Sequence, residues 1–168
     1  MTTLFPIGVQ KQATLSDDGL YRYRLTRTWD ESRGRVNFLM LNPSVADADI
    51  DDPTIRKCVG FAKSWGFGEL VVTNLFAWRS TDPKALKWVV DPVGPFNDWY
   101  LVDTARRSER VVCGWGTHGP LFGRDRAVRS LLRAASIPTY HLGLTRGGQP
   151  GHPLFLPYTA NLIPWEDP

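Results

Sequence analysis

The sequence predicts an α/β fold of three layers, in which helices cover both faces of a central, mainly parallel, four-stranded sheet with an N-terminal hairpin at its edge. Two observations predict it. Short apolar runs of strand-favouring residues recur with almost no alternation, as in strands buried on both faces. Amphipathic helical segments separate these runs, which is typical of parallel βαβ units. The 168 residues have the length of one domain, so we expect a single domain spanning residues 1–168.

The N-terminal part of the chain predicts the edge hairpin. Residues 21–27 alternate between apolar and polar side chains, which is typical of a half-exposed strand paired with a neighbour. Positions 21, 23 and 25 share one face, and Arg22, Arg24 and Thr26 share the other. We expect the arginine face to be a solvated edge, with phosphate contact as the less favoured alternative.

The first two core strands each end at an asparagine. Residues 36–41 form an apolar run that stops at Asn42, because the proline that follows has no N–H for the ladder. Residues 70–73 form the second run, which leads into Asn74. Between these strands, an Asp-Pro step at Asp52 predicts the start of a helix. Its sheet-facing positions are Ile55, Cys58, Val59 and Ala62.

The second half of the chain continues the alternation. Residues 96–107 and 121–135 predict helices, and residues 110–116 and 137–142 predict the third and fourth core strands. We expect the first helix to turn inward Trp99, Leu101 and Val102. The second helix is basic and amphipathic. Its packed positions are Leu121, Val128, Leu131 and Leu132. Its surface arginines are Arg124, Arg126, Arg129 and Arg133.

Composition limits the class of function. The formal net charge of +3 is mildly basic, which permits nucleic acid binding without requiring it. Neither Cys58 nor Cys113 has a Cys or His at metal-ligand spacing, so we expect two buried thiols and no metal or cofactor. The sequence predicts no signal peptide and no membrane-spanning stretch. We therefore expect a cytoplasmic monomer.

Three polar side chains, Asn42, Asn74 and His152, each follow a core strand. Because the carboxyl ends of parallel strands lie on one side of a sheet, we expect them to meet in one crevice. Two carboxamides and an imidazole can position a water, read the edge of a flat heterocycle and donate to a developing anion, but they supply no ready nucleophile. This pattern predicts cleavage of a bond whose leaving group is a heterocyclic anion. For Asn42, shaping the turn before proline is the alternative.

Four motifs carry a resemblance to known families. Residues 40–44 (Met-Leu-Asn-Pro-Ser), 51–56, 73–83 and 148–154 (Gly-Gln-Pro-Gly-His-Pro-Leu) resemble the bacterial DUF1643 family. More distantly, the same landmarks in the same order resemble the uracil-DNA glycosylase superfamily. That resemblance implies a uracil-DNA-glycosylase-like fold. It also implies a DNA glycosylase that hydrolyses the N-glycosidic bond of a flipped uracil or modified pyrimidine, including hypermodified bases of viral DNA, and leaves an abasic site.

The resemblance also implies roles for individual residues. Asn42 would hold the attacking water, Asn74 would hydrogen-bond the edge of the base, and His152 would stabilise charge on the departing base. Asp47, Asp51 or Asp52 would be the general base, although helix capping is the favoured role of Asp52. The remaining base-binding candidates are Leu41, Phe76 and Trp78. The DNA-binding candidates are Ser44, Arg79, Gly116, Arg146, Pro153, Leu154 and Phe155, with Leu154 or Phe155 as the wedge that fills the gap in the stack.

Two other classes of function stay open. The usual His-Pro-Ser of the uracil-DNA glycosylase superfamily is His-Pro-Leu here, so a phosphate-contacting serine is missing at Leu154. This departure suits a module that binds nucleic acid or a modified base without chemistry. Clustered carboxylates at Asp47, Asp49, Asp51 and Asp52 suit Mg²⁺ and would indicate a metal-dependent nuclease. Sensitivity to EDTA separates the nuclease from the glycosylase.

Overall fold

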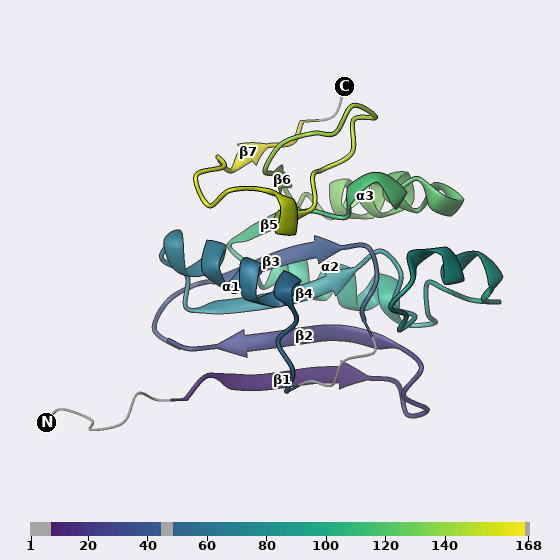
Figure 1. Cartoon of the computed structure of the whole chain (residues 1–168), viewed down its shortest axis with the longest axis horizontal. Helices are drawn as coiled ribbons and strands as arrows, with labels where there is room; N and C mark the ends of the chain where they lie inside the picture. The colour runs from purple at the N-terminus through teal and green to yellow at the C-terminus, as the bar shows by residue number, and fades with distance from the viewer. Residues whose placement is uncertain (1–7, 45–48, 167–168) are drawn as a thin grey trace, which may run out of the picture.

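The computed structural model describes residues 8–44 and 49–166. Its centre is a mixed sheet of seven strands in the order β1-β2-β4-β3-β5-β6-β7 (Figure 1). The strands are β1 Gln10–Leu15, β2 Arg22–Thr28, β3 Arg35–Met40, β4 Glu69–Asn74, β5 Arg110–Cys113, β6 Tyr140–His141 and β7 Ile163–Pro164. The α/β class is confirmed, but the prediction of four strands is wrong. The N-terminal hairpin pairs with β4 and so extends the core sheet, and β7 is too short to leave a pattern in the sequence.

The four predicted core strands form the parallel part of the sheet. β3 lies between β4 and β5, and β6 follows β5, with all three pairings parallel. The chain therefore leaves β3 on one side to form β4 and later returns to the other side to form β5. At such a reversal of strand order, the loops that leave the carboxyl ends diverge and open a crevice. β3 is buried along its length after Arg35, as its largely apolar run predicts.

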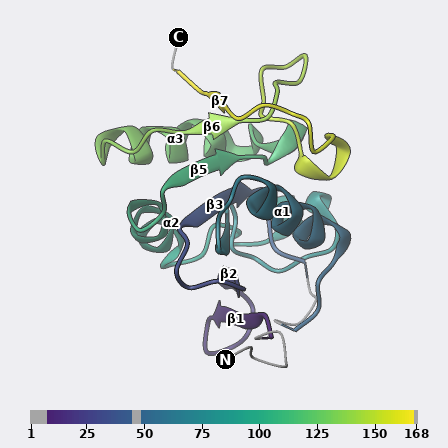
Figure 2. The ribbon, with the colours of Figure 1, turned by 90° about the vertical axis from the view of Figure 1, so that its left-hand side faces the viewer.

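Helices cover both faces of the sheet. Figure 2 shows α1, Pro53–Ser64, on one side, and α2, Asn97–Arg106, with α3, Arg124–Ala134, on the other. The apolar core is accordingly divided in two. Phe38, Phe61 and Val72 belong to the cluster under α1, and Leu39 and Leu132 belong to the cluster under α2 and α3. None of the described helices is both long and apolar enough to cross a bilayer.

The predicted start of α1 is confirmed. Asp52 is its N-cap, and its Oδ1 accepts a hydrogen bond of 2.8 Å from the backbone N–H of Ile55. Ile55, Cys58 and Ala62 face the sheet as predicted, together with Phe61. Both cysteines are buried free thiols, and burial raises the pKa of each, so neither is poised as a nucleophile.

Two predicted helix faces differ from the structure. Trp99 of α2 is 61% exposed, because Leu101 and Ala105 occupy the face that meets the core. On α3, Arg124 is buried, although the sequence placed it on the surface. The left-handed backbone at Phe122 and Gly123 separates the 3-10 helix Leu121–Gly123 from α3, so Arg124 opens α3 and turns inward. Its Nε donates to the Leu75 carbonyl (2.7 Å), and it pairs with Asp98.

The alternation predicted for residues 21–27 is interrupted by a shift of register in the hairpin. Leu15 pairs with Arg22 and Thr14 pairs with Arg24, so Tyr23 is an additional residue on β2. Tyr23 and Arg24 both contact Tyr100 of α2. The extra residue puts Arg22 on the α1 face of the sheet. The expectation of one solvated arginine face, with Arg22, Arg24 and Thr26 together, is therefore wrong. β2 also lies inside the sheet, between β1 and β4, so of the two hairpin strands only β1 is an edge strand.

Candidate functional site

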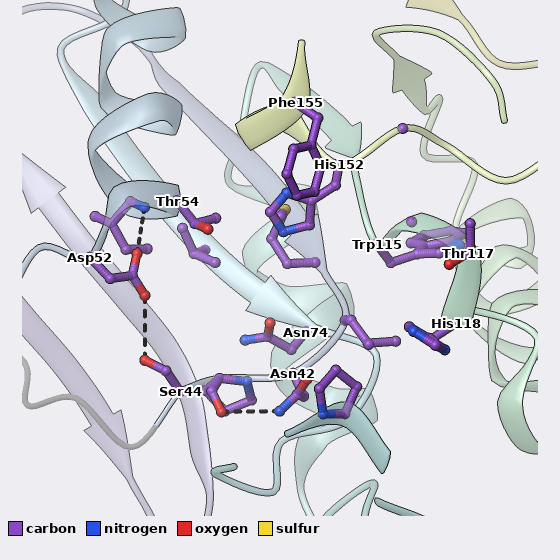
Figure 3. Close-up of a pocket in the computed structure, with 18 of the residues that line it drawn as sticks. Asn42, Ser44, Asp52, Thr54, Asn74, Trp115, Thr117, His118, His152 and Phe155 are labelled. Carbon is purple, nitrogen blue, oxygen red and sulfur yellow. Dashed lines mark hydrogen bonds between the residues drawn. The ribbon is translucent and has the colours of Figure 1, made fainter. Parts of the chain in front are cut away.

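A cavity of about 670 Å³ opens at the carboxyl ends of the parallel strands. Its walls come from the loops after β3, β4 and β5, from the start of α1 and from the loop that contains His152. Figure 3 shows Asn42, Asn74 and His152 around the same hollow. The other candidates from the sequence that line it are Leu41, Ser44, Asp52, Gly116 and Phe155. The cavity thus brings together three polar groups that are far apart along the chain.

Asn74, the last residue of β4, presents a buried amide to the cavity. The residue is only 3% exposed, and no described residue forms a hydrogen bond with its side chain. A buried amide without a partner costs free energy unless a ligand or water satisfies it. Its backbone is held from behind, where Asn97 Nδ2 donates to the carbonyls of Asn74 (2.9 Å) and Leu75 (3.1 Å). The site therefore offers one donor and one acceptor on a rigid support.

This support predicts a positioning role for Asn97. Replacing Asn97, which is fully buried, by alanine leaves the Asn74 carbonyl without its donor, so we expect the free energy of unfolding to fall by about 1–3 kcal/mol. Chemical denaturation measures the change. Arg106→Ala is the matched control, because Arg106 is exposed on the same helix, and it should alter the free energy of unfolding by less than about 0.5 kcal/mol. Equal losses in both variants would contradict this role.

Asn42 is fixed by its amide nitrogen. Nδ2 donates to the carbonyls of Ser80 (2.8 Å) and Pro43 (3.2 Å), so it ties the loop after β3 to the loop after β4. This is the turn-shaping role that the Asn-Pro step suggested. These two hydrogen bonds also determine which end of the amide stays available to a ligand. No described donor reaches Oδ1, so that oxygen is the part of Asn42 able to accept a hydrogen bond from a bound water.

Asp52 stands at the same wall of the cavity. One carboxylate oxygen caps α1, and the other accepts a long hydrogen bond of 3.4 Å from Ser44 Oγ (Figure 3). The capping role favoured by the sequence is thus present. Its charge also reaches two other groups of the site, because it raises the pKa values of His152 and Arg22 against the lowering effect of burial.

His152 enters the cavity from a loop and has a defined tautomer. It caps the 3-10 helix Pro153–Phe155, where its Nδ1 accepts a hydrogen bond from the Leu154 N–H (3.2 Å). Nδ1 therefore carries no proton, and a neutral ring holds its proton on Nε2. Burial lowers the pKa of His152, with Asp52 acting in the opposite direction. The site thus contains a neutral imidazole that donates through Nε2.

Two glycines let the His152 loop approach β5. A Cβ added at Gly114 would lie 2.9 Å from Pro153 Cδ, which is closer than side chains tolerate. Gly116 has φ of +75°, a conformation that glycine adopts without strain, and its N–H donates to the Pro150 carbonyl. The glycine-rich exit of the third core strand therefore serves to dock the loop that delivers His152.

Several predicted site residues lie outside the cavity. Phe76 is fully buried in the α2 side of the core, and Trp78 packs edge-on against Tyr21, so neither is placed to stack on a ligand in this cavity. Arg79 Nη1 donates to the Gly19 carbonyl at 3.0 Å. The others outside the lining are Arg146 and Leu154, which are exposed, and Pro153, which is buried. The period of a strand sets side-chain directions only as far as the strand continues, and all six residues lie outside the named strands, Pro153 and Leu154 of them in the 3-10 helix.

Arg22 and Trp115 are among the lining residues that were not predicted as site residues. Arg22 reaches the cavity because of the register shift in β2. Trp115 is 1% exposed and lies at the exit of β5, where its Nε1 donates to Gln149 Oε1 at 2.7 Å. The sequence offered a signal for Trp115, since it lies at the carboxyl end of the predicted third core strand, residues 110–116. It offered none for Arg22, because alternation pointed away from the site.

The acidic segment is engaged by the chain's own cations. Asp51 pairs with Arg27 (2.7 Å) and Lys11 (3.3 Å). Burial acts to raise the pKa of Asp51, but the hydrogen bonds and charges of Arg27 and Lys11 outweigh it and hold the pKa below its usual value. Asp49 is exposed, and Asp47 lies outside the described residues. Within residues 8–44 and 49–166, no three His, Cys, Asp or Glu side chains are grouped as a metal site.

Comparison with known proteins gives one result. The family model described as "Protein of unknown function (DUF1643)" matches residues 22–154, a range that includes Arg22, Asn42, Asn74 and His152. Curated proteins and solved structures give no match to the chain. The matched range covers most of the 168 residues and runs from β2 through β6. The chain belongs to the DUF1643 family.

Proposed function

We propose that this protein is a DNA glycosylase, which hydrolyses the N-glycosidic bond of an extruded uracil or modified pyrimidine, hypermodified bases included, and leaves an abasic site. The observation that supports the proposal is the meeting of Asn42, Asn74 and His152 in one cavity at the carboxyl ends of β3 and β4. The resemblance of the sequence landmarks, in their order, to those of the uracil-DNA glycosylase superfamily supports the same reaction.

Each group has a role that its hydrogen bonds permit. Asn74 offers its free donor and acceptor to the edge of the base. Asn42 Oδ1 accepts from a water and orients it toward the sugar carbon, while its nitrogen is held by Ser80. His152 donates from Nε2 to the base carbonyl, where negative charge grows as the bond breaks. The water oxygen bonds to the sugar carbon, the bonding pair of the carbon–nitrogen bond leaves with the base, and the proton of the water passes to Asp52 or to solvent.

The rim of the cavity suits an extruded nucleotide. Phe155 is 81% exposed beside the opening, and its ring centroid lies 5.6 Å from that of His152 (Figure 3). An exposed aromatic residue at this place is suited to fill the gap that a flipped base leaves in the stack. Of the two wedge candidates, Phe155 lines the cavity and Leu154 does not.

The direct test is to identify what the protein releases from DNA. The full chain is incubated with DNAs containing uracil, modified pyrimidines or the hypermodified bases of viral genomes, in the presence of EDTA. Mass spectrometry should detect a free base, and the strand should become cleavable by alkali at the abasic site. Strand breaks without a free base, or activity that EDTA removes, would contradict the proposal.

A second candidate is a module that binds a modified base without cleaving it. The observation that favours it is that both oxygens of Asp52 and the amide nitrogen of Asn42 are already engaged by the chain. A carboxylate oxygen that already accepts a hydrogen bond from the chain is less available to a bound water. Saturable binding of one DNA from the panel, with no base released over many hours, would favour this candidate.

The ionisation of His152 predicts the acid limb of the reaction. Its lowered pKa keeps the ring neutral below about pH 6.5, where an exposed histidine becomes charged. A proton on Nδ1 would point at the N–H of Leu154, so two hydrogen-bond donors would face each other and the capping bond would be lost. We therefore expect base release to stay constant down to about pH 6.5 and to fall in more acid solution, in a pH–rate profile under single-turnover conditions.

The lowered pKa of His152 also affects the stability of the fold. Below about pH 6.5 the unfolded chain binds the proton that the folded chain resists, so the free energy of unfolding should also fall as the pH decreases through that window. The control is His152→Gln, which cannot titrate there. It should lack the acid limb of the rate and should lose less stability in this window than the wild type, since His141, whose pKa burial also lowers, still titrates. An identical profile in His152→Gln would assign the limb to another group.

A further inference from the structure

Arg22 is a buried cation at the wall of the cavity. It is 5% exposed and lines the same hollow as Asn74 and Val72. β2 runs antiparallel to β4, and the N–H of Arg22 donates to the Ala77 carbonyl (2.9 Å), so Arg22 lies beside the segment that follows Asn74. The register shift at Tyr23 sets it on the α1 face together with Leu25, which packs in the same cluster as Val72. A bulge next to a site is a recurrent device for redirecting a side chain.

The guanidinium keeps its charge in this position. Burial lowers its pKa to about 10, helped by the charges of Arg79 and Arg27 and opposed by that of Asp52. At neutral pH it is therefore protonated. A guanidinium has only donors and no acceptor, whereas the amide of Asn74 has both. Because none of the described residues fixes the Asn74 amide, that group can rotate to suit either a carbonyl or an amino group on a ligand.

We propose that Arg22 determines which base the cavity accepts, by donating to an oxygen on it. Arg22 faces a carbonyl or acidic oxygen of the bound pyrimidine, and the cavity rejects a base that presents an exocyclic amino group there. The inference rests on the proposed function in one respect, namely that the ligand is a base. It does not require that the base be cleaved.

The physical reason is a conflict between donors. An amino group opposite Arg22 sets two donors against each other in a buried position, where neither group offers the other an acceptor. Rotation of the Asn74 amide cannot relieve this conflict, because the conflict lies at the guanidinium of Arg22. A good pair of hydrogen bonds to a base edge discriminates by about 1–3 kcal/mol, and the middle of this range corresponds to about tenfold to a hundredfold in affinity. Arg22 therefore supplies the selectivity that Asn74 alone does not.

Four free bases distinguish the possible positions of the oxygen. Uracil carries a ring carbonyl where cytosine carries an exocyclic amino group, and the 5-carboxy derivative of each base adds an acidic oxygen. If Arg22 faces the ring, both uracils should bind the full chain about tenfold to a hundredfold more tightly than both cytosines. If it faces the substituent, both carboxy derivatives should bind more tightly than the parent bases by a similar factor. Isothermal titration calorimetry measures the four affinities.

The variants connect the preference to Arg22. Arg22→Gln removes the charge and adds an acceptor, so the ratio between preferred and rejected bases should fall close to one. Arg22→Lys keeps a donor without the planar fork and should keep part of the ratio. The matched control is Arg24→Gln, two residues along the same strand, because Arg24 lies outside the cavity on the α2 face, 3.3 Å from Asp103. Arg24→Gln should leave the ratio unchanged.

The outcomes separate this inference from the proposed function. Thermal unfolding establishes whether each variant is folded, and Arg22→Lys provides the test if Arg22→Gln is not. A wild-type chain that binds all four bases equally, or none of them, overturns the inference, as does an unchanged ratio in folded Arg22→Gln. A clear preference that depends on Arg22, in a protein that releases no base from DNA, would support the inference and contradict the glycosylase.

Discussion

Replacing His152 by alanine is expected to slow base release by about 10²–10³-fold, because the variant loses the donor that meets charge on the departing base. The interaction strengthens only as the glycosidic bond breaks, so the loss should appear in kcat and leave KM nearly unchanged. Single-turnover release of base from saturating DNA gives the rate. The capping bond to Leu154 is lost as well, so a thermal melt should accompany the measurement.

The matched control for this variant is His118→Ala. His118 lines the same cavity but is exposed at its rim, beyond β5 (Figure 3). It should release base at close to the wild-type rate. His152→Gln, which keeps a donor of similar reach, should fall between the wild type and His152→Ala. A folded His152→Ala protein with the wild-type rate would remove His152 from the reaction.

Replacing Asn74 by alanine is expected to weaken binding of the substrate base by about tenfold to a hundredfold, because the edge of the base then loses the donor and the acceptor that the amide offers. Asn74 meets the base before and during bond breaking, so the change should raise KM more than it lowers kcat. In this respect Asn74→Ala and His152→Ala should differ. Titration of a fluorescent DNA that carries the substrate base measures the affinity directly.

Asn74→Asp distinguishes hydrogen bonding from shape. The side chain keeps its size but becomes an acceptor only, and its charge is costly at a position that is 3% exposed. We expect binding at least as weak as that of Asn74→Ala. The control is Thr117→Ala at the exposed rim of the cavity, which should bind DNA as the wild type does. Equal binding by folded Asn74→Asp and wild type would show that the base does not reach the end of β4.

Much of the framework could be predicted from the sequence, because it depends on interactions between near neighbours. The burial of β3 on both faces follows from a largely apolar run with almost no alternation, and the start of α1 follows from an Asp-Pro step. The common location of Asn42 and Asn74 follows from one geometric rule, that parallel strands end on the same side of a sheet. Such features need only the period of an element and the residues at its ends.

Features set by pairing between distant segments were predicted poorly. The hairpin extends the core sheet because β2 pairs with β4, and nothing within residues 21–27 specifies that partner. Phe76 and Trp78 follow β4 closely, but the strand no longer dictates their directions, and they pack away from the cavity. Trp99 is exposed because Leu101 and Ala105 face the core in its place.

The sequence by itself determined the layers of this protein, the polar residues at the strand ends and the cap of α1, since local periodicity and backbone chemistry encode them. Only the tertiary structure decided what surrounds those polar residues. One additional residue at Tyr23 moves Arg22 from an expected solvated edge to the wall of the cavity. A shift of one residue in register reverses the faces of a strand, and register depends on the partner strand rather than on the strand's own sequence.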